Sequence, residues 1–187
     1  MVDVTPKEVT HRRAIARGKV FMKPETTSLI ARGAVTKGDV LSVARVAGIQ
    51  ASKRTPDLIP LCHPLLVGSV FLNFRIEDAY IEVEAQVETV DRTGVEMEAL
   101  TACSVAALTI YDMCKSADRS MVIGEVTLWE KTGGRSGTYR RDPLEAVDGS
   151  VDPDGAFGVA RLEDLDMDLD GDLGRDLDDL GDRDDLS

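Results

Sequence analysis

The amino-acid composition changes abruptly at about Asp142, and this change divides the chain into a part that can fold and a part that cannot. Residues 142–187 hold 17 of the 34 acidic residues but only 3 of the 22 basic ones, a net charge of −14 against +2 for residues 1–141. Residues 162–185 are mostly Asp, Leu and Gly, with no β-branched or aromatic side chain. Such a segment cannot bury enough apolar surface to offset the entropy lost on folding. We therefore predict a folded domain over 1–141 and a disordered acidic tail over 142–187.

The charge and hydropathy of the predicted domain exclude several classes of partner. A net charge near zero provides no broad basic surface, which argues against nucleic-acid binding. The chain has no run of about 18 apolar residues that would span a membrane. The N-terminal sequence MVDVTPKEVTHRR has no apolar stretch typical of a secretory signal. We expect a cytoplasmic protein with neither a nucleic-acid nor a membrane partner.

The cysteines and histidines do not predict a structural bridge or a metal site. The three cysteines are an odd number without a CxxC pair, so they indicate neither a disulfide framework nor structural zinc. The only two histidines, His11 and His63, lie far apart in the sequence. We expect buried free thiols in a reducing compartment and no bound metal.

Hydrophobic periodicity predicts the elements of an α+β domain. Strands are expected over 12–22, 69–75, 80–90 and 122–129, and helices over 24–33, 37–53 and 94–115. A turn near Glu77 and Asp78 joins the second and third strands as a hairpin, and two prolines make 58–66 a loop. The order strand, helices, hairpin, helix, strand predicts a ferredoxin-like antiparallel sheet with helices on one face.

Two short sequences resemble capping boxes and predict where two helices begin. Thr36 is followed three residues later by Asp39, and Thr93 by Glu96. Capping explains Glu96 but not Glu98, although acidic residues are common in a first helical turn.

Two groups of charged residues are candidates for acid–base chemistry. Lys37 at a predicted helix start would attract anions and have its pKa lowered by the helix dipole. The alternative is an ordinary solvated lysine. Asp112 and Lys115 lie three residues apart near a helix end and so share a face. Such a pair can hold a proton-transfer lysine beside its ionised partner. The alternative is a simple surface ion pair.

Two further motifs have both a functional and a structural interpretation. The proline-framed sequence Leu61-Cys62-His63-Pro64 fixes a histidine, either for function or in a structural hydrogen bond. The glycine-rich stretch 131–137 can wrap phosphate oxygens with backbone N–H groups, although it lacks the P-loop order and is otherwise a mobile linker.

The tail contains part of a calcium-loop pattern. Asp166, Asp168, Asp170 and Gly171 match its first positions, but Leu177 replaces the glutamate that completes such a loop. We expect diffuse retention of cations or water there, not specific calcium binding.

Four long stretches resemble the MoaC family of molybdenum cofactor biosynthesis, the cyclic pyranopterin monophosphate synthases. They are MVDVTPKEVTHRRAIARG, KGDVLSVARVAGIQASKRTPDLIPLCHPL, RTGVEMEALTACSVAALTIYDMCKSAD and KTGGRSG, and together they extend from Met1 to about Gly137. The resemblance implies a ferredoxin-like fold and a homohexamer, a trimer of dimers, with active sites at the dimer interface. It implies a lyase without a redox cofactor. Its substrate would be a cyclised dihydroguanosine triphosphate made by the preceding radical-SAM enzyme, and its products cyclic pyranopterin monophosphate and diphosphate.

The same resemblance implies roles for individual residues. Asp112 is similar to the active-site aspartate of the family, and Lys37 and Lys115 to the lysines taken as general acid and base. The implied substrate-binding residues are Leu61, Cys62, His63, Met97 and Glu98, with Arg12 and Lys131 toward the triphosphate. A polyanionic substrate suits these basic residues, since loss of diphosphate needs charge stabilisation. Arg135 stands where lysine is usual in the family, which keeps the charge but changes the geometry toward phosphate.

Two alternatives compete with this interpretation. A non-catalytic nucleotide-binding or regulatory module would keep Arg12 and Lys131 but have no need of the proton-transfer residues. The presence of Lys37, Asp112 and Lys115 favours an enzyme. The tail has no counterpart in the family, and it is a candidate to dock on a basic partner.

Overall fold

A computed structural model describes residues 1–135 and 137–142, so the predicted tail and its calcium-loop pattern lie outside the described residues except for Asp142. The elements are β1 (Thr10–Phe21), α1 (Pro24–Ala31), α2 (Val40–Ser52), α3 (Thr55–Leu58), β2 (Ser69–Ile76), β3 (Tyr80–Asp91), α4 (Glu96–Cys114), β4 (Val122–Thr132) and β5 (Tyr139–Arg140). Each predicted strand and helix is confirmed, with ends that differ by a few residues.

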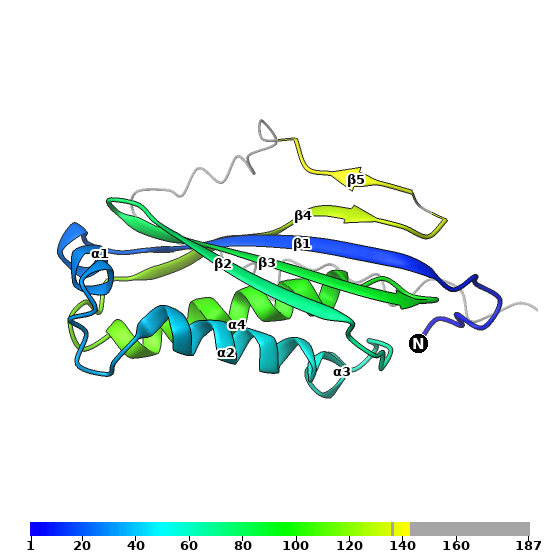
Figure 1. Ribbon diagram of the computed structural model, residues 1–187, viewed down its shortest axis with the longest axis horizontal. Helices are drawn as coiled ribbons and strands as arrows, with labels where there is room; N and C mark the ends of the chain where they lie inside the picture. The colour runs from blue at the N-terminus through cyan, green and yellow to red at the C-terminus, as the bar shows by residue number, and fades with distance from the viewer. Residues whose placement is uncertain (136, 143–187) are drawn as a thin grey trace, which may run out of the picture. The chain divides into compact units, whose positions relative to one another are not determined.

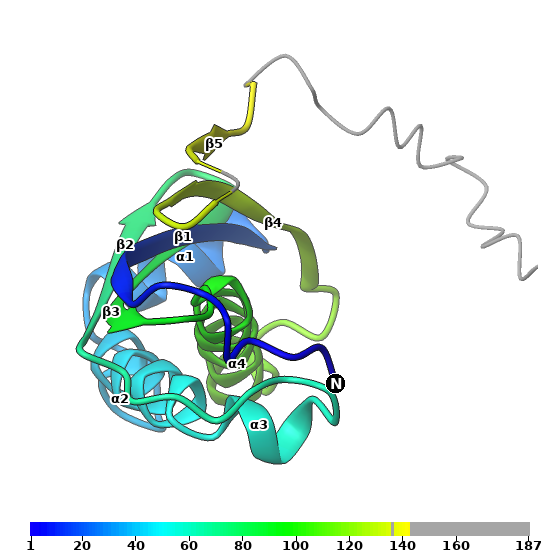
Figure 2. The same ribbon diagram turned by 90° about the vertical axis from the view of Figure 1, so that its right-hand side faces the viewer.

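The strands form one antiparallel sheet in the order β2-β3-β1-β4-β5. The central strand β1 pairs with β3 along its whole length, from Thr10 opposite Asp91 to Phe21 opposite Tyr80. The first four strands have the arrangement of a ferredoxin-like fold, and β5 extends the sheet beyond β4. The helices α2 and α4 lie side by side beneath one face of the sheet (Figures 1 and 2). The predicted ferredoxin-like α+β fold is confirmed.

The core lies between this face of the sheet and α4. Along β3, every second side chain is buried, as a half-buried strand requires, and Ile81, Val83 and Val87 are fully buried. Each contributes roughly 1.5–3 kcal/mol through removal from water. At Gly48 the backbone of α2 comes so close to α4 that an added Cβ would lie 2.8 Å from the Ala102 carbonyl oxygen.

The start of α2 corrects the first capping prediction. Asp39 is itself the N-cap, and its Oδ1 accepts a 3.0 Å hydrogen bond from the Ser42 N–H. Gly38, at φ +97°, closes a turn through a hydrogen bond to the Val35 carbonyl and separates Thr36 from the helix. Lys37 therefore lies in a turn before α2 and not on its first turn.

The start of α4 corrects the second capping prediction. The helix begins at Glu96 without a side-chain cap, so Thr93 does not form a capping box. The Glu96 carboxylate instead accepts a 3.0 Å hydrogen bond from Lys131 Nζ on β4. The short elements α3 and β5 were not predicted, because a single helical turn and a two-residue strand leave no periodic pattern in the sequence.

The helix α4 is long and apolar enough to cross a membrane by length and composition alone, with a mean hydropathy of 1.2. Half of this stretch is buried within the fold, beneath the sheet. The core helix of a folded domain has the same length and composition.

Candidate active site

The structure brings Lys37, Asp112 and Lys115 together. Lys115 Nζ lies 2.6 Å from Asp112 Oδ1, and Lys37 Nζ lies 2.7 Å from Asp112 Oδ2. All three side chains are about half exposed, at 54%, 44% and 56% for Lys115, Lys37 and Asp112. We refer to these three residues, which the sequence predicts to transfer protons, as the proton-transfer cluster.

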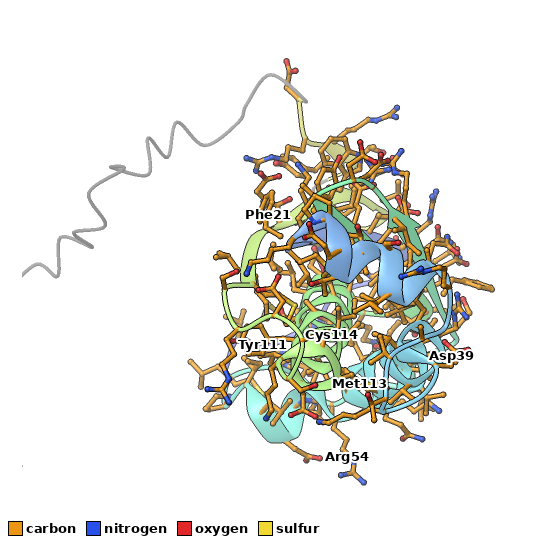
Figure 3. The ribbon with its side chains drawn as sticks, turned by 90° about the vertical axis from the view of Figure 1, so that its left-hand side faces the viewer. Phe21, Asp39, Arg54, Tyr111, Met113 and Cys114 are labelled. Carbon is orange, nitrogen blue, oxygen red and sulfur yellow. The ribbon has the colours of Figure 1, made fainter. Side chains whose placement is uncertain are left out.

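Backbone structure places each member of the proton-transfer cluster. Asp112 and Lys115 lie at the C-terminal end of α4, whereas Lys37 enters from the turn before α2. Lys37 Nζ also donates a 2.8 Å hydrogen bond to the Asp112 carbonyl oxygen, in the last helical turn, where carbonyls lack intrahelical partners. Figure 3 looks onto this end of the molecule and labels Met113 and Cys114 of α4 and Asp39 before α2.

The two lysines keep Asp112 ionised. Hydrogen bonds from Lys115 and then Lys37 lower the pKa of Asp112 to about 2. The cluster therefore places one ionised carboxylate between two lysine side chains. It offers ammonium protons to a bound molecule and an anion that stabilises whichever lysine is protonated.

A second group of predicted residues lies at the opposite end of α4. Glu98 is 1% exposed, and its Oε2 has no hydrogen-bond partner among the described residues. Cys62 Sγ lies 3.7 Å from Glu98 Oε1. Burial raises the pKa of Glu98, and burial followed by the nearby Glu98 charge raises that of Cys62. A buried carboxyl oxygen without a partner is costly, so this site is suited to a polar ligand.

The other predicted substrate contacts are the sequence neighbours of Cys62 and Glu98, and they differ in exposure. Leu61 is 72% exposed and Met97 37% exposed, and His63 is half-buried. The bond from the Cys62 N–H to the Ile59 carbonyl forms the turn that directs this segment toward α4.

A basic hollow of about 360 Å³ opens beside the start of β1. Arg12 is fixed there, because its Nε and Nη2 donate to the Asp91 and Arg92 carbonyl oxygens at 2.9 and 3.0 Å. The hollow is lined by Lys7, Glu8, Thr10, Arg12, Gly134 and Arg135. Three cationic side chains against one carboxylate suit an anionic ligand.

The predicted glycine-rich loop packs against Arg12. A Cβ added at Gly134, which has φ +74°, would lie 2.1 Å from Arg12 Nη1. Glycine therefore allows the loop to approach the guanidinium closely. Lys131 is placed nearby on β4 by its bond to Glu96.

The predicted site residues thus fall into two groups on one chain. Glu98 and Asp112 are fourteen residues apart on α4, which corresponds to about 21 Å along a helix. The proton-transfer cluster lies at the end next to α1, and the other group lies toward α3 and the N-terminus (Figure 1). Among the described residues, the two groups therefore lie at opposite ends of α4 within one copy of the chain.

Sequence reasoning missed the pairing of Glu96 with Lys131 and the Lys7 and Thr10 side chains in the hollow. Glu96 was assigned to a cap, and nothing in the sequence near Lys7 or Thr10 signals a ligand. Within the described part of the chain, no three His, Cys, Asp or Glu side chains are grouped to hold a metal ion.

Comparison with known proteins identifies the family. A model of the MoaC family matches residues 1–134. Proteins named cyclic pyranopterin monophosphate synthase are similar to this chain. The protein of Thermomicrobium roseum is 60% identical to it, and the match covers 78% of this chain and 89% of the relative. The protein of Pelotomaculum thermopropionicum is 58% identical, and the match covers 78% of this chain and 87% of the relative. Cyclic pyranopterin monophosphate synthase 3 of Mycobacterium tuberculosis is 54% identical over 83% and 89%. The chain belongs to the MoaC family.

Proposed function

We propose that this protein is a cyclic pyranopterin monophosphate synthase of molybdenum cofactor biosynthesis. It would convert a cyclised dihydroguanosine triphosphate into cyclic pyranopterin monophosphate and diphosphate, as a lyase that needs no redox cofactor. The observation that carries the proposal is the convergence of Lys37, Asp112 and Lys115 in a chain 60% identical to a protein of that name.

The proton-transfer cluster would perform the acid–base steps. Opening and closing rings on a purine-derived skeleton moves protons and consumes no oxidant, so lysines in complementary roles suffice. Lys37 and Lys115 would act as general acid and general base. Asp112 would hold both amines in place and stabilise their protonated forms.

The opposite end of α4 would bind the substrate. The unpartnered Glu98 oxygen is suited to a ring N–H, with Cys62 beside it and Leu61, His63 and Met97 around them. Arg12 and Lys131 would hold the triphosphate. The basic hollow next to Arg12 supports this placement.

Formation of a cyclic monophosphate from a triphosphate requires a substrate hydroxyl to attack the α-phosphorus while the bond to the β-phosphate oxygen breaks. Negative charge then develops on the departing diphosphate. Fixed cations such as the Arg12 guanidinium lower the cost of this charge, because hydrogen bonds already hold them in position.

The active site would form between two copies of the chain. Met97, Thr101, Ser104, Leu108 and Asp112 recur every three or four residues and so share one face of α4. Leu108 on this face is 57% exposed. Antiparallel packing of two such faces would bring the proton-transfer cluster of one copy to the Glu98 of the other, as the dimer within a homohexamer.

The proposed reaction involves a small-molecule substrate made by another enzyme. A radical-SAM enzyme would supply the triphosphate substrate in the cytoplasm. Neither a nucleic acid nor a membrane would take part.

The test is turnover of the cyclised triphosphate by the wild type, Lys37→Ala and Asp112→Asn. The wild type should form both products, and the two variants should bind substrate without converting it. A wild type that binds but never converts the substrate would instead support a regulatory module.

A further inference from the structure

Asp118 is a buried carboxylate just beyond the proton-transfer cluster, and it accepts four hydrogen bonds. The side chain is 2% exposed. Its Oδ1 accepts from the Ser120 N–H at 2.9 Å and from Ser120 Oγ at 2.6 Å. Its Oδ2 accepts from the Lys23 N–H at 2.9 Å and from Thr26 Oγ1 at 3.3 Å. The bonds from Ser120 and then from Lys23 lower the pKa of Asp118 to about 2, so it stays ionised.

These bonds join the two segments that carry the lysines of the cluster. The Asp118 N–H donates to the Cys114 carbonyl at 3.0 Å, so Asp118 closes the turn that contains Lys115. On its other side it holds Lys23 and Thr26 at the start of α1.

The path from α1 to Lys37 is short and constrained. Gly33, at φ +65°, ends α1 with a bond to the Ile30 carbonyl, and the Val35–Gly38 turn follows directly. A shift of α1 away from α4 would therefore move Lys37. Exposed lysines pair weakly and adopt many rotamers, so a fixed geometry has to come from the backbone that carries them.

We propose that Asp118 is a positioning residue that holds Lys37 and Lys115 in place around Asp112. It does not touch the reacting atoms. The expected change in kcat rests on the proposed function. The expected displacement of the two lysines does not, because it is measurable without substrate.

The test is Asp118→Asn in the full chain. Asparagine keeps the size of the side chain but places an NH₂ donor against N–H and O–H donors. Displacement of the lysines should lower kcat roughly 10- to 100-fold, with KM changed less than twofold. Trace acetylation followed by mass spectrometry should show Lys37 and Lys115 several-fold more reactive than in the wild type. The internal reference is the exposed Lys53 at the C-cap of α2.

A control separates positioning from simple destabilisation. Val83→Ala removes two methyl groups from a fully buried side chain on β3 and should lower the melting temperature without changing the two lysine reactivities. If Asp118→Asn does not fold, Thr26→Val provides the test. This variant removes only one hydrogen bond to Asp118 and should cause the same changes to a smaller extent. Wild-type lysine reactivities and kcat in a folded Asp118→Asn protein would overturn the proposal. A wild type without turnover would overturn the proposed function alone, since the labelling does not depend on it.

Discussion

Lys115 Nζ lies 2.6 Å from Asp112 Oδ1, on the same end of α4, and Lys37 reaches the other oxygen of that carboxylate from a segment 75 residues away. An aspartate near a helix C-terminus is unfavourable because of the helix dipole. The two lysines offset this cost. The same arrangement provides the amines that we assign to proton transfer.

Asp112 should titrate well below an ordinary aspartate. Carboxyl NMR, assigned by comparison with Asp112→Asn, should give a pKa of about 2 against a reference value of 3.8. Lys115→Gln should raise the pKa toward the reference value more than Lys37→Gln, because the Lys115 hydrogen bond is the larger cause. Stability from these pairs should be present above pH 4 and be lost as the pH falls toward 2. An unshifted Asp112 would mean that the cluster does not form in solution.

Glu98→Gln should stabilise the protein at high pH. Burial raises the folded-state pKa of Glu98 above its unfolded value, so stability is lost as the pH rises through the folded-state pKa. Glutamine has no carboxyl proton to lose and stays neutral at every pH. At pH 8 its melting temperature should exceed that of the wild type, because the buried glutamine amide stays neutral where the glutamate ionises. At pH 4 the difference should shrink, as thermal unfolding followed by circular dichroism would show.

This account of Glu98 would be contradicted if the difference in stability between the wild type and Glu98→Gln stayed constant from pH 4 to pH 8. The carboxylate would then be solvated or paired with a cation in the assembled protein.

Gly134→Ala should weaken substrate binding by displacing Arg12. The added Cβ would overlap the guanidinium at the far end of the long Arg12 side chain and not the backbone, so the fold should persist while the guanidinium is displaced. We expect the KM for the triphosphate to rise roughly tenfold, which corresponds to about 1.4 kcal/mol. Gly137→Ala is the matched control, because Gly137 also has a positive φ but an added Cβ there meets no atom within 4 Å among the described residues. Equal changes in KM for the two variants would place the effect in loop strain and not in Arg12.

Gly48→Ala should destabilise the fold. Its Cβ would lie 2.8 Å from the Ala102 carbonyl oxygen and 2.6 Å from Leu72 Cδ2, so α2 would have to move away from α4. Overpacking of this kind costs about 1–3 kcal/mol in the free energy of unfolding. Urea unfolding measures it, with Gln50→Ala at an exposed position of α2 as the control. Unchanged stability would show that the two helices have room to separate.

The sequence predicted the order and type of the main elements because their patterns are long. The alternation along 80–90 and the apolar stretch after Gly94 each extend over several turns or pleats, and the structure confirms both as β3 and α4. The helix starts were predicted less well. Asp39 and Glu96 each have several possible bonding partners, and tertiary contacts such as Lys131 decide among them.

The site was predicted in part. Asp112 and Lys115 share a face by helical spacing alone. The approach of Lys37 to Asp112 and of Cys62 to Glu98 depends on how distant segments pack, so residue spacing does not predict it. Asp118 went unnoticed, because a single aspartate after a helix gives no sign that it will be buried.

The most direct test of the account is subunit mixing between Asp112→Asn and Glu98→Gln. Each variant alone should be nearly inactive, because each lacks one half of every active site. Co-expression in equal amounts should restore about a quarter of wild-type turnover, because half of the dimers are mixed and each mixed dimer has one intact site of two. Turnover that stays at the level of the separate variants would contradict an active site shared between two copies of the chain.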